Sequence, residues 1–172
     1  MLNRKMEKLL TRCIKEHKEN VYRLAYSYVK NKEDALDIVQ DSIYKAMTHI
    51  EGLKDPEAVK SWFYRIVVNT ALDFLRRNKK VRTMDHETIE IYASGAEDDY
   101  ANFDLNRTLE ELPEKYRSVI VLRYFEDMKI DEVAAVLGEN VNTVKTRLYQ
   151  ALRVMRTKMD DESSKEIKSN EQ

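Results

Sequence analysis

Glycine and proline, the residues that most often interrupt secondary structure, occur only 3 and 2 times in the 172 residues of this chain. Apolar residues recur instead three, four and seven positions apart, as an amphipathic helix requires, and no run of alternating β-branched residues competes with that pattern. We therefore predict an all-α fold. The length suits two small helical domains and leaves little room for a large catalytic one.

Local signals place several of the expected helices. Asn31 followed by Asp34 predicts a helix start, because the Asn side chain can accept an amide of the first turn and an acid is favoured there. After a connecting loop, a long helix is expected from about 58 to 82. Pro113 suits the first position of a later helix. The expected buried side chains of that helix are Val119, Ile120, Leu122 and Phe125.

Charge is segregated along the chain, although its formal net value is only -1. Positions 60–82 hold seven Lys or Arg residues and the single acid Asp73, whereas positions 85–104 hold seven acids and no Lys or Arg. The acidic stretch is predicted to be a mostly extended linker. The expected division is a first domain at 1–84, the linker at 85–104, a second domain at 105–160 and a disordered tail at 161–172.

The segment from Ile130 to Met159 carries the strongest functional signal. A short helix is expected to end at Gly138, and a second helix follows after a tight turn. Short helix, turn and longer basic helix describe a helix-turn-helix. The expected core positions of the second helix are Val144, Leu148, Ala151, Leu152 and Met155. Its polar face contains Thr143, Thr146, Gln150 and Arg153, flanked by Lys145, Arg147 and Tyr149.

Such a polar face offers the donors and acceptors that read base edges in the major groove of DNA. The alternative is an ordinary helical hairpin whose charges are merely solvated. From Asn142 to Lys158 the chain has basic residues and no acids, which favours a DNA-binding helix.

The long helix expected at 58–82 provides a second candidate surface. Its apolar stripe consists of Phe63, Ile66, Val67, Ala71 and Phe74. A different face carries Trp62, Arg65, Asn69, Asp73, Arg76 and Lys80. An aromatic ring beside cations can stack on unpaired bases while the cations follow the phosphates. The alternative is that Trp62 simply covers a loop. A third face, formed by Asp37, Gln40, Asp41 and Tyr44, receives no function from its spacing alone.

In this order, these pieces resemble the sigma-70 family, and specifically its small extracytoplasmic-function group, which retains only conserved regions two and four. The ordered set covers most of the chain and is far more specific than any one motif. The matching residues are the run from Asp34 through Gln40 to Asp41, Ser61-Trp62-Phe63-Tyr64-Arg65-Ile66, Asp73-Phe74-Leu75-Arg76-Arg77, Leu112-Pro113-Glu114 and Asn142-Thr143-Val144-Lys145-Thr146-Arg147-Leu148. Tyr26 to Asn31, Ala35 to Gln40 and Gly138 to Asn140 are further similar to the sigma-V type of Gram-positive bacteria.

The resemblance implies a sigma factor that binds RNA polymerase core and directs it to promoter DNA. It implies binding to a coiled coil of the polymerase clamp for Asp37, Gln40, Asp41 and Tyr44. It implies recognition and melting of the minus-ten element for the loop at 49–59 and for Trp62, Arg65, Asn69, Arg76, Arg77 and Lys80. It implies contacts with the minus-thirty-five element for Lys145, Thr146, Tyr149, Gln150 and Arg153, with Arg123, Thr143 and Arg147 nearer the DNA backbone.

Further implied partners are the polymerase flap and a membrane-anchored anti-sigma factor, which holds the protein inactive until the cell envelope is attacked. The acidic linker is similar to family linkers that occupy a positively charged polymerase channel. The sequence departs from the family at Lys129, where a capping Ser or Thr is common, so a weak start is expected for the first helix of the helix-turn-helix.

Residues needed for other functions are missing or scattered. Cys13 is the only cysteine. None of the three histidines, His17, His49 and His86, has a second ligand at metal-binding spacing. No Gly-rich phosphate loop or nucleophile–base pair is present, so we expect no catalytic residues, metal, cofactor or small-molecule substrate. No apolar stretch is long enough for a signal peptide or a membrane span, and a cytoplasmic protein is expected.

Two alternatives stay open. One is a transcriptional regulator with the same helix-turn-helix but an unrelated helical sensor domain, which the aromatic and basic stripe at 62–80 argues against. The other is a helical adaptor that binds only proteins, for which DNA affinity does not depend on Lys145 and Arg147.

Overall fold

The computed structural model of the protein describes residues 2–84 and 107–170, and neither range contains a β-strand. The first range contains α1 (Leu2–Val29), α2 (Lys32–Thr48), the short 3-10 turns η1 (Ile50–Gly52) and η2 (Pro56–Ala58), and α3 (Val59–Met84). In the second range, residues 107–111 are helical and are followed by α5 (Glu114–Ile120), the π-helical turn η3 (Val121–Phe125), α6 (Ile130–Leu137) and α7 (Val141–Asn170). The all-α prediction is confirmed.

The helices of the first part pack through apolar stripes, and the stripe of α3 is the one predicted from the sequence. Leu24 of α1, Ile38 of α2 and Phe63 of α3 are almost completely buried. The predicted start of α2 is confirmed, because the Asn31 side chain accepts a hydrogen bond from the backbone N–H of Asp34 at 3.0 Å. The predicted long helix is α3, which places its basic residues along one continuous rod.

Two predicted details of the second part are wrong. Pro113 precedes α5 instead of opening it, because its ψ of 142° is extended and its carbonyl accepts the amides of Tyr116 and Arg117. Leu152 is not a core residue: its side chain is 41 % exposed, while Ala151 and Met155 fill the contact with α5.

Residues 161–170, part of the tail predicted to be disordered, continue α7 to Asn170. No Gly or Pro follows Gly138, so nothing in the sequence breaks the helix. The hydroxyls of Ser163 and Ser164 donate to the carbonyls four residues earlier. The predicted acidic linker at 85–104 lies outside the described residues.

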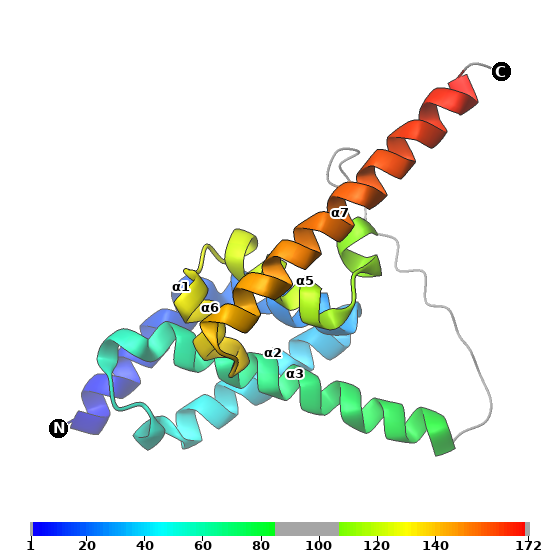
Figure 1. Cartoon of the computed structure of the whole chain (residues 1–172). Coiled ribbons are helices and arrows are strands. Elements are labelled where there is room, and N and C mark those ends of the chain that lie inside the picture. Colours follow the sequence, from blue (N-terminus) through cyan, green and yellow to red (C-terminus); the bar gives the residue numbers. More distant parts are fainter. Residues whose placement is uncertain (1, 85–106, 171–172) are drawn as a thin grey trace.

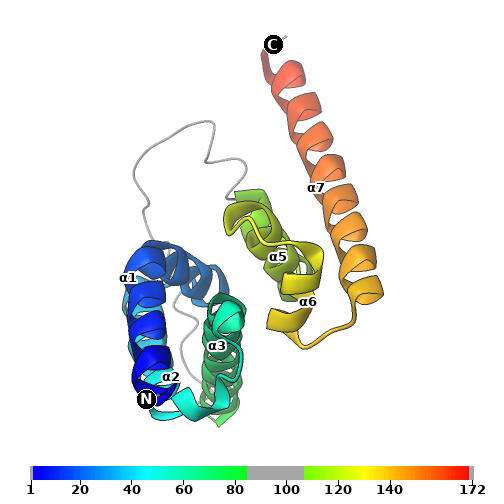
Figure 2. The same cartoon turned by 90° about the vertical axis from the view of Figure 1, so that its left-hand side faces the viewer.

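The two parts of the chain lie against each other. Figure 2 shows α1, α2 and α3 as one group and α5, α6 and α7 as another, with α5 and α6 on the side that faces the first group. The main contacts join α3 to α6 and α1 to α5 and η3. One continuous apolar cluster contains Phe63 and Val68 from the first part together with Leu122, Val133 and Val136 from the second. The end of α7 projects beyond this body (Figure 1).

Candidate nucleic-acid and polymerase interfaces

Helices α6 and α7 form a helix-turn-helix with well-defined ends. Gly138 terminates α6 in the left-handed conformation with φ 66°, as predicted. The amide of Thr143 donates to Asn140 Oδ1 at 2.8 Å, so Asn140 caps the start of α7. Lys129 cannot accept a capping bond, but the Glu132 carboxylate accepts its backbone N–H at 2.7 Å. The start of α6 therefore keeps half of a capping box, and the expected weakness is smaller than predicted.

The first turns of α7 present a continuous polar face to solvent. Tyr149 is 70 % exposed on this face. The other fully exposed members are Lys145, Thr146, Gln150 and Arg153. These positions lie one, four, five and eight residues apart counted from Lys145, which places them along one side of the helix. Donors and acceptors of the kind that read base edges thus stand together, away from the core.

Three further residues predicted to approach DNA are half-buried and held by neighbouring groups. Arg147 forms an ion pair of 3.0 Å with Glu139, and Arg123 donates to the carbonyl of Met128 at 3.3 Å. Thr143 lies in the capped first turn of α7. These contacts restrain the side chains at the edge of the polar face, where a DNA backbone would pass.

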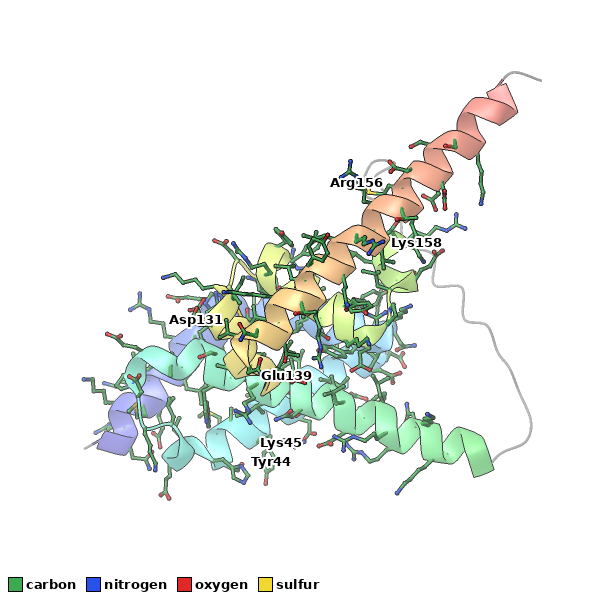
Figure 3. All side chains as sticks on the ribbon, in the orientation of Figure 1. Tyr44, Lys45, Asp131, Glu139, Arg156 and Lys158 are labelled. Carbon is green, nitrogen blue, oxygen red and sulfur yellow. The ribbon has the colours of Figure 1, made fainter. Side chains whose placement is uncertain are left out.

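A groove of about 430 Å³ adjoins the polar face between α5 and α7. Tyr116 spans it, because its hydroxyl donates to Gln150 Oε1 at 2.9 Å. Lys158 lies at its far end in an ion pair of 2.8 Å with Glu111, whereas Arg156 is exposed elsewhere on α7 (Figure 3). Tyr116 thus adjoins the polar face of α7, hereafter the reading face; no local sequence pattern predicts this contact, because it joins residues 34 positions apart.

The second candidate surface runs along α3. Arg65, Asn69, Arg76 and Lys80 are exposed, as their shared helical face predicts, and the adjacent Arg77 is exposed as well. Arg76 pairs with Asp73 at 2.8 Å, which keeps one acid within the basic stripe. Trp62 is half-buried, and a Cβ placed on Gly52 would lie 3.8 Å from its Nε1. The indole therefore covers the turn η1 with one part of its ring and leaves another part accessible to solvent.

The third surface is the outer face of α2. Asp37 and Gln40 are exposed, Asp41 is half-buried in an ion pair of 3.0 Å with Lys45, and Tyr44 is 68 % exposed (Figure 3). An exposed aromatic ring among polar groups is a common centre of protein–protein interfaces.

Two apolar residues that the sequence analysis missed extend this α2 face. Leu36 is 51 % exposed and Met47 is 42 % exposed. Both lie off the Ala35 and Ile38 stripe that enters the core, which was a usable signal in the sequence. The face is therefore apolar as well as acidic, and it suits a protein partner better than it suits DNA.

Within residues 2–84 and 107–170, no three His, Cys, Asp or Glu side chains gather in a way that could hold a metal ion. None of the helices in that part of the chain is long and apolar enough to span a membrane.

Family comparisons match both parts of the chain. Residues 13–81 match the family described as Sigma-70 region 2, and residues 103–155 match Sigma-70, region 4. The chain belongs to the sigma-70 family, in its extracytoplasmic-function group. It is 56 % identical to RNA polymerase sigma factor SigV of Bacillus subtilis over 154 residues, covering 90 % of this chain and 93 % of the relative. It is 30 % identical to the ECF RNA polymerase sigma factor SigW of the same species, covering 84 % and 86 %.

Solved structures show the same fold. CnrH, solved in complex with the cytosolic domain of CnrY, has a TM-score of 0.67 at 25 % identity and covers 88 % of each chain. The sigma factor RpoE of Bartonella quintana, solved with the anti-sigma factor NepR, has a TM-score of 0.70 at 21 % identity and covers 92 % of this chain and 96 % of its own. The chain is thus an RNA polymerase sigma factor by sequence, with the matching fold.

Proposed function

We propose that three separate faces of this sigma factor divide the work of initiation. The α2 face binds the polymerase clamp, the α3 stripe reads and melts the minus-ten element, and the α7 face reads the minus-thirty-five element. The observation that carries the proposal is the α7 face, where Lys145, Thr146, Tyr149, Gln150 and Arg153 stand exposed on a capped helix-turn-helix. Domain limits at 1–84 and 105–160 belong to the same proposal.

Strand opening is driven by the free energy of binding to the separated DNA strands. The second domain holds duplex DNA through the major groove, while the α3 stripe captures bases of the non-template strand once they unstack. Stacking on the accessible part of Trp62 stabilises the open strand, and Arg65, Arg76 and Lys80 neutralise phosphates. Binding energy therefore drives melting, and we expect no nucleotide hydrolysis and no catalytic activity of the chain itself.

Control by a membrane-anchored anti-sigma factor completes the proposal. Two relatives support it: RpoE of Bartonella quintana was solved with an anti-sigma factor, and the 56 % identical relative is SigV. We propose a cytoplasmic protein that is released when the cell envelope is attacked, and that also contacts the polymerase flap.

Reconstituted transcription tests the function directly. Purified protein is added to sigma-free core polymerase with a genomic library of promoter fragments, and the transcripts are sequenced. Defined start sites preceded by common minus-ten and minus-thirty-five sequences support the proposal and identify the promoter. If core polymerase is not bound at all, the proposed role of the α2 face and the division of work among the three faces are wrong.

The α2 face makes a separate prediction about polymerase binding. Replacing Gln40 and Tyr44 together with alanine should weaken binding to core polymerase by about tenfold or more, since a single central aromatic residue often contributes about 2 kcal/mol to an interface. Titration of the labelled protein with core polymerase measures the change. Glu19→Ala, at an exposed position of α1, is the control. Equal affinity of both variants for core polymerase would argue against a role of the α2 face in binding it.

A further inference from the structure

The contact between the two parts of the chain is specific as well as apolar. The hydroxyl of Tyr28 on α1 is hydrogen-bonded to that of Ser118 on α5, and burial raises the pKa of Tyr28 to about 12. Lys30 donates to the backbone carbonyl of Glu110 at 2.7 Å. Polar bonds at two points around an apolar interface define one arrangement of the parts, because a shifted arrangement would leave these groups unpaired.

Glu126 is the deepest polar group in this contact. Its side chain belongs to the second part but is completely buried against the first. The Tyr64 hydroxyl donates to Glu126 Oε2 at 3.0 Å, and Arg23 Nε lies 3.8 Å from Oε1. Lys60 Nζ donates to the backbone carbonyl of Glu126 at 3.5 Å. The carboxyl group therefore enters a socket made by α1 and α3.

The socket holds Glu126 incompletely. Its Oε1 atom is buried and has no hydrogen-bond partner. Burial raises the pKa of Glu126 above its ordinary value, although Tyr64, Arg23 and Lys60 each lower it in part. A buried carboxylate costs free energy unless charged groups and donors face it, so Glu126 depends on the Tyr64 and Arg23 groups that the first part supplies. Those contacts exist only while the two parts stay together.

Two unusual backbone conformations flank Glu126 and direct its side chain toward the first part. A π-helical turn precedes it, and its amide donates to the carbonyl of Val121 at 3.0 Å. Asp127 follows with φ 51°, in the left-handed region that non-glycine residues rarely occupy. Two locally unfavourable features next to each other are retained where the surrounding structure or the function demands them.

The closed arrangement is incompatible with reading both promoter elements at once. Elements centred at minus ten and minus thirty-five lie roughly 80 Å apart along a duplex with 3.4 Å per base pair. In the structure, a Cβ built on Gly138 would lie 3.5 Å from Arg65 Nη2, so the turn between α6 and α7 lies beside the α3 stripe. The parts must separate before both surfaces can engage DNA.

We propose that the closed arrangement is an autoinhibited state of the free sigma factor, and that Glu126, seated in the socket of Arg23, Lys60 and Tyr64, is its latch. The inference rests on the proposed function for its consequence at promoters, whereas the latch itself concerns the free chain. Opening exposes the socket and frees the second part to reach the distant promoter element.

Domain separation can be measured without polymerase or DNA. Dyes are placed at Lys8→Cys on α1 and Ser163→Cys on α7, both exposed, in a Cys13→Ala background. Energy transfer is followed through a urea titration beside far-UV circular dichroism. Glu126→Ala and Tyr64→Phe should each raise the open-to-closed ratio roughly tenfold. Energy transfer is then lost at a lower urea concentration than in the unaltered chain, while the urea concentration at which the helices unfold stays the same.

Asp131→Ala is the matched control, because Asp131 is an exposed acid on the same part of the chain. If the two latch variants lose transfer at the same urea concentration as this control, the latch is disproved. Glu126→Ala should also raise the rate at which the protein, core polymerase and promoter DNA reach an open complex. Loss of transfer without that gain would overturn autoinhibition, and failure of the unaltered chain to bind core would instead contradict the proposed function.

Discussion

Replacing Lys145 and Arg147 together with alanine is expected to weaken binding to a minus-thirty-five duplex by about two orders of magnitude. A base contact, as expected for Lys145, contributes about 1 to 3 kcal/mol. Loss of Arg147, which forms a 3.0 Å ion pair with Glu139 at the edge of the face, removes an expected phosphate contact as well. Fluorescence anisotropy at fixed salt measures the dissociation constant. The slope of log affinity against log salt should also become shallower by up to about two charges.

A matched control removes the same number of positive charges from the same helix. Arg156 and Lys165 are exposed on α7 beyond Arg153, the last residue of the reading face, so the Arg156→Ala, Lys165→Ala double variant has the same net charge as the test variant. If both double variants lose affinity equally, α7 attracts DNA only through its overall charge, and the face does not read bases.

The second large effect is expected at Trp62. Trp62→Ala should reduce the equilibrium population of open complex by roughly tenfold to a hundredfold, since stacking contributes about 1 to 3 kcal/mol for each base. Initial binding to closed duplex should change little, because no base is unstacked at that step. Permanganate footprinting follows the melted bases, and filter binding follows the duplex complex.

The position of Trp62 over Gly52 requires a control for a purely structural role. Trp62→Phe keeps a flat ring and should retain most of the opening. An indole that only covers the η1 turn would behave differently: the alanine variant would lose thermal stability and would lose duplex binding and opening in equal measure. That outcome contradicts the stacking role.

Local signals in the sequence were sufficient to predict the main helices and the helix faces that remain exposed to solvent. Asn31 and Gly138 specify helix ends through their own side-chain or backbone chemistry, which needs no knowledge of the rest of the fold. The faces of α2, α3 and α7 follow from helical spacing in the same way. Their assignment to polymerase, minus-ten and minus-thirty-five elements came from the family resemblance and stays a prediction.

What the sequence did not reveal depends on packing between distant segments. Glu126 is charged and follows Phe125, so local pattern alone places it in solvent; only the approach of α1 and α3 buries it. Leu152 fits a core spacing, yet α5 covers only one side of α7 and leaves it exposed. Both errors arise because periodicity identifies a stripe without identifying the element that covers it.

The length of α7 has a practical consequence. Its 30 residues extend over roughly 45 Å at 1.5 Å per residue, and beyond Gly138 no glycine or proline introduces a hinge. The half that leaves the body moves as one rod with the half that carries the reading face. Exposed Ser163 lies roughly 27 Å along that rod from Lys145. A reporter attached at Ser163 is therefore rigidly connected to the reading face, and its position relative to DNA reports the orientation of that face in the groove.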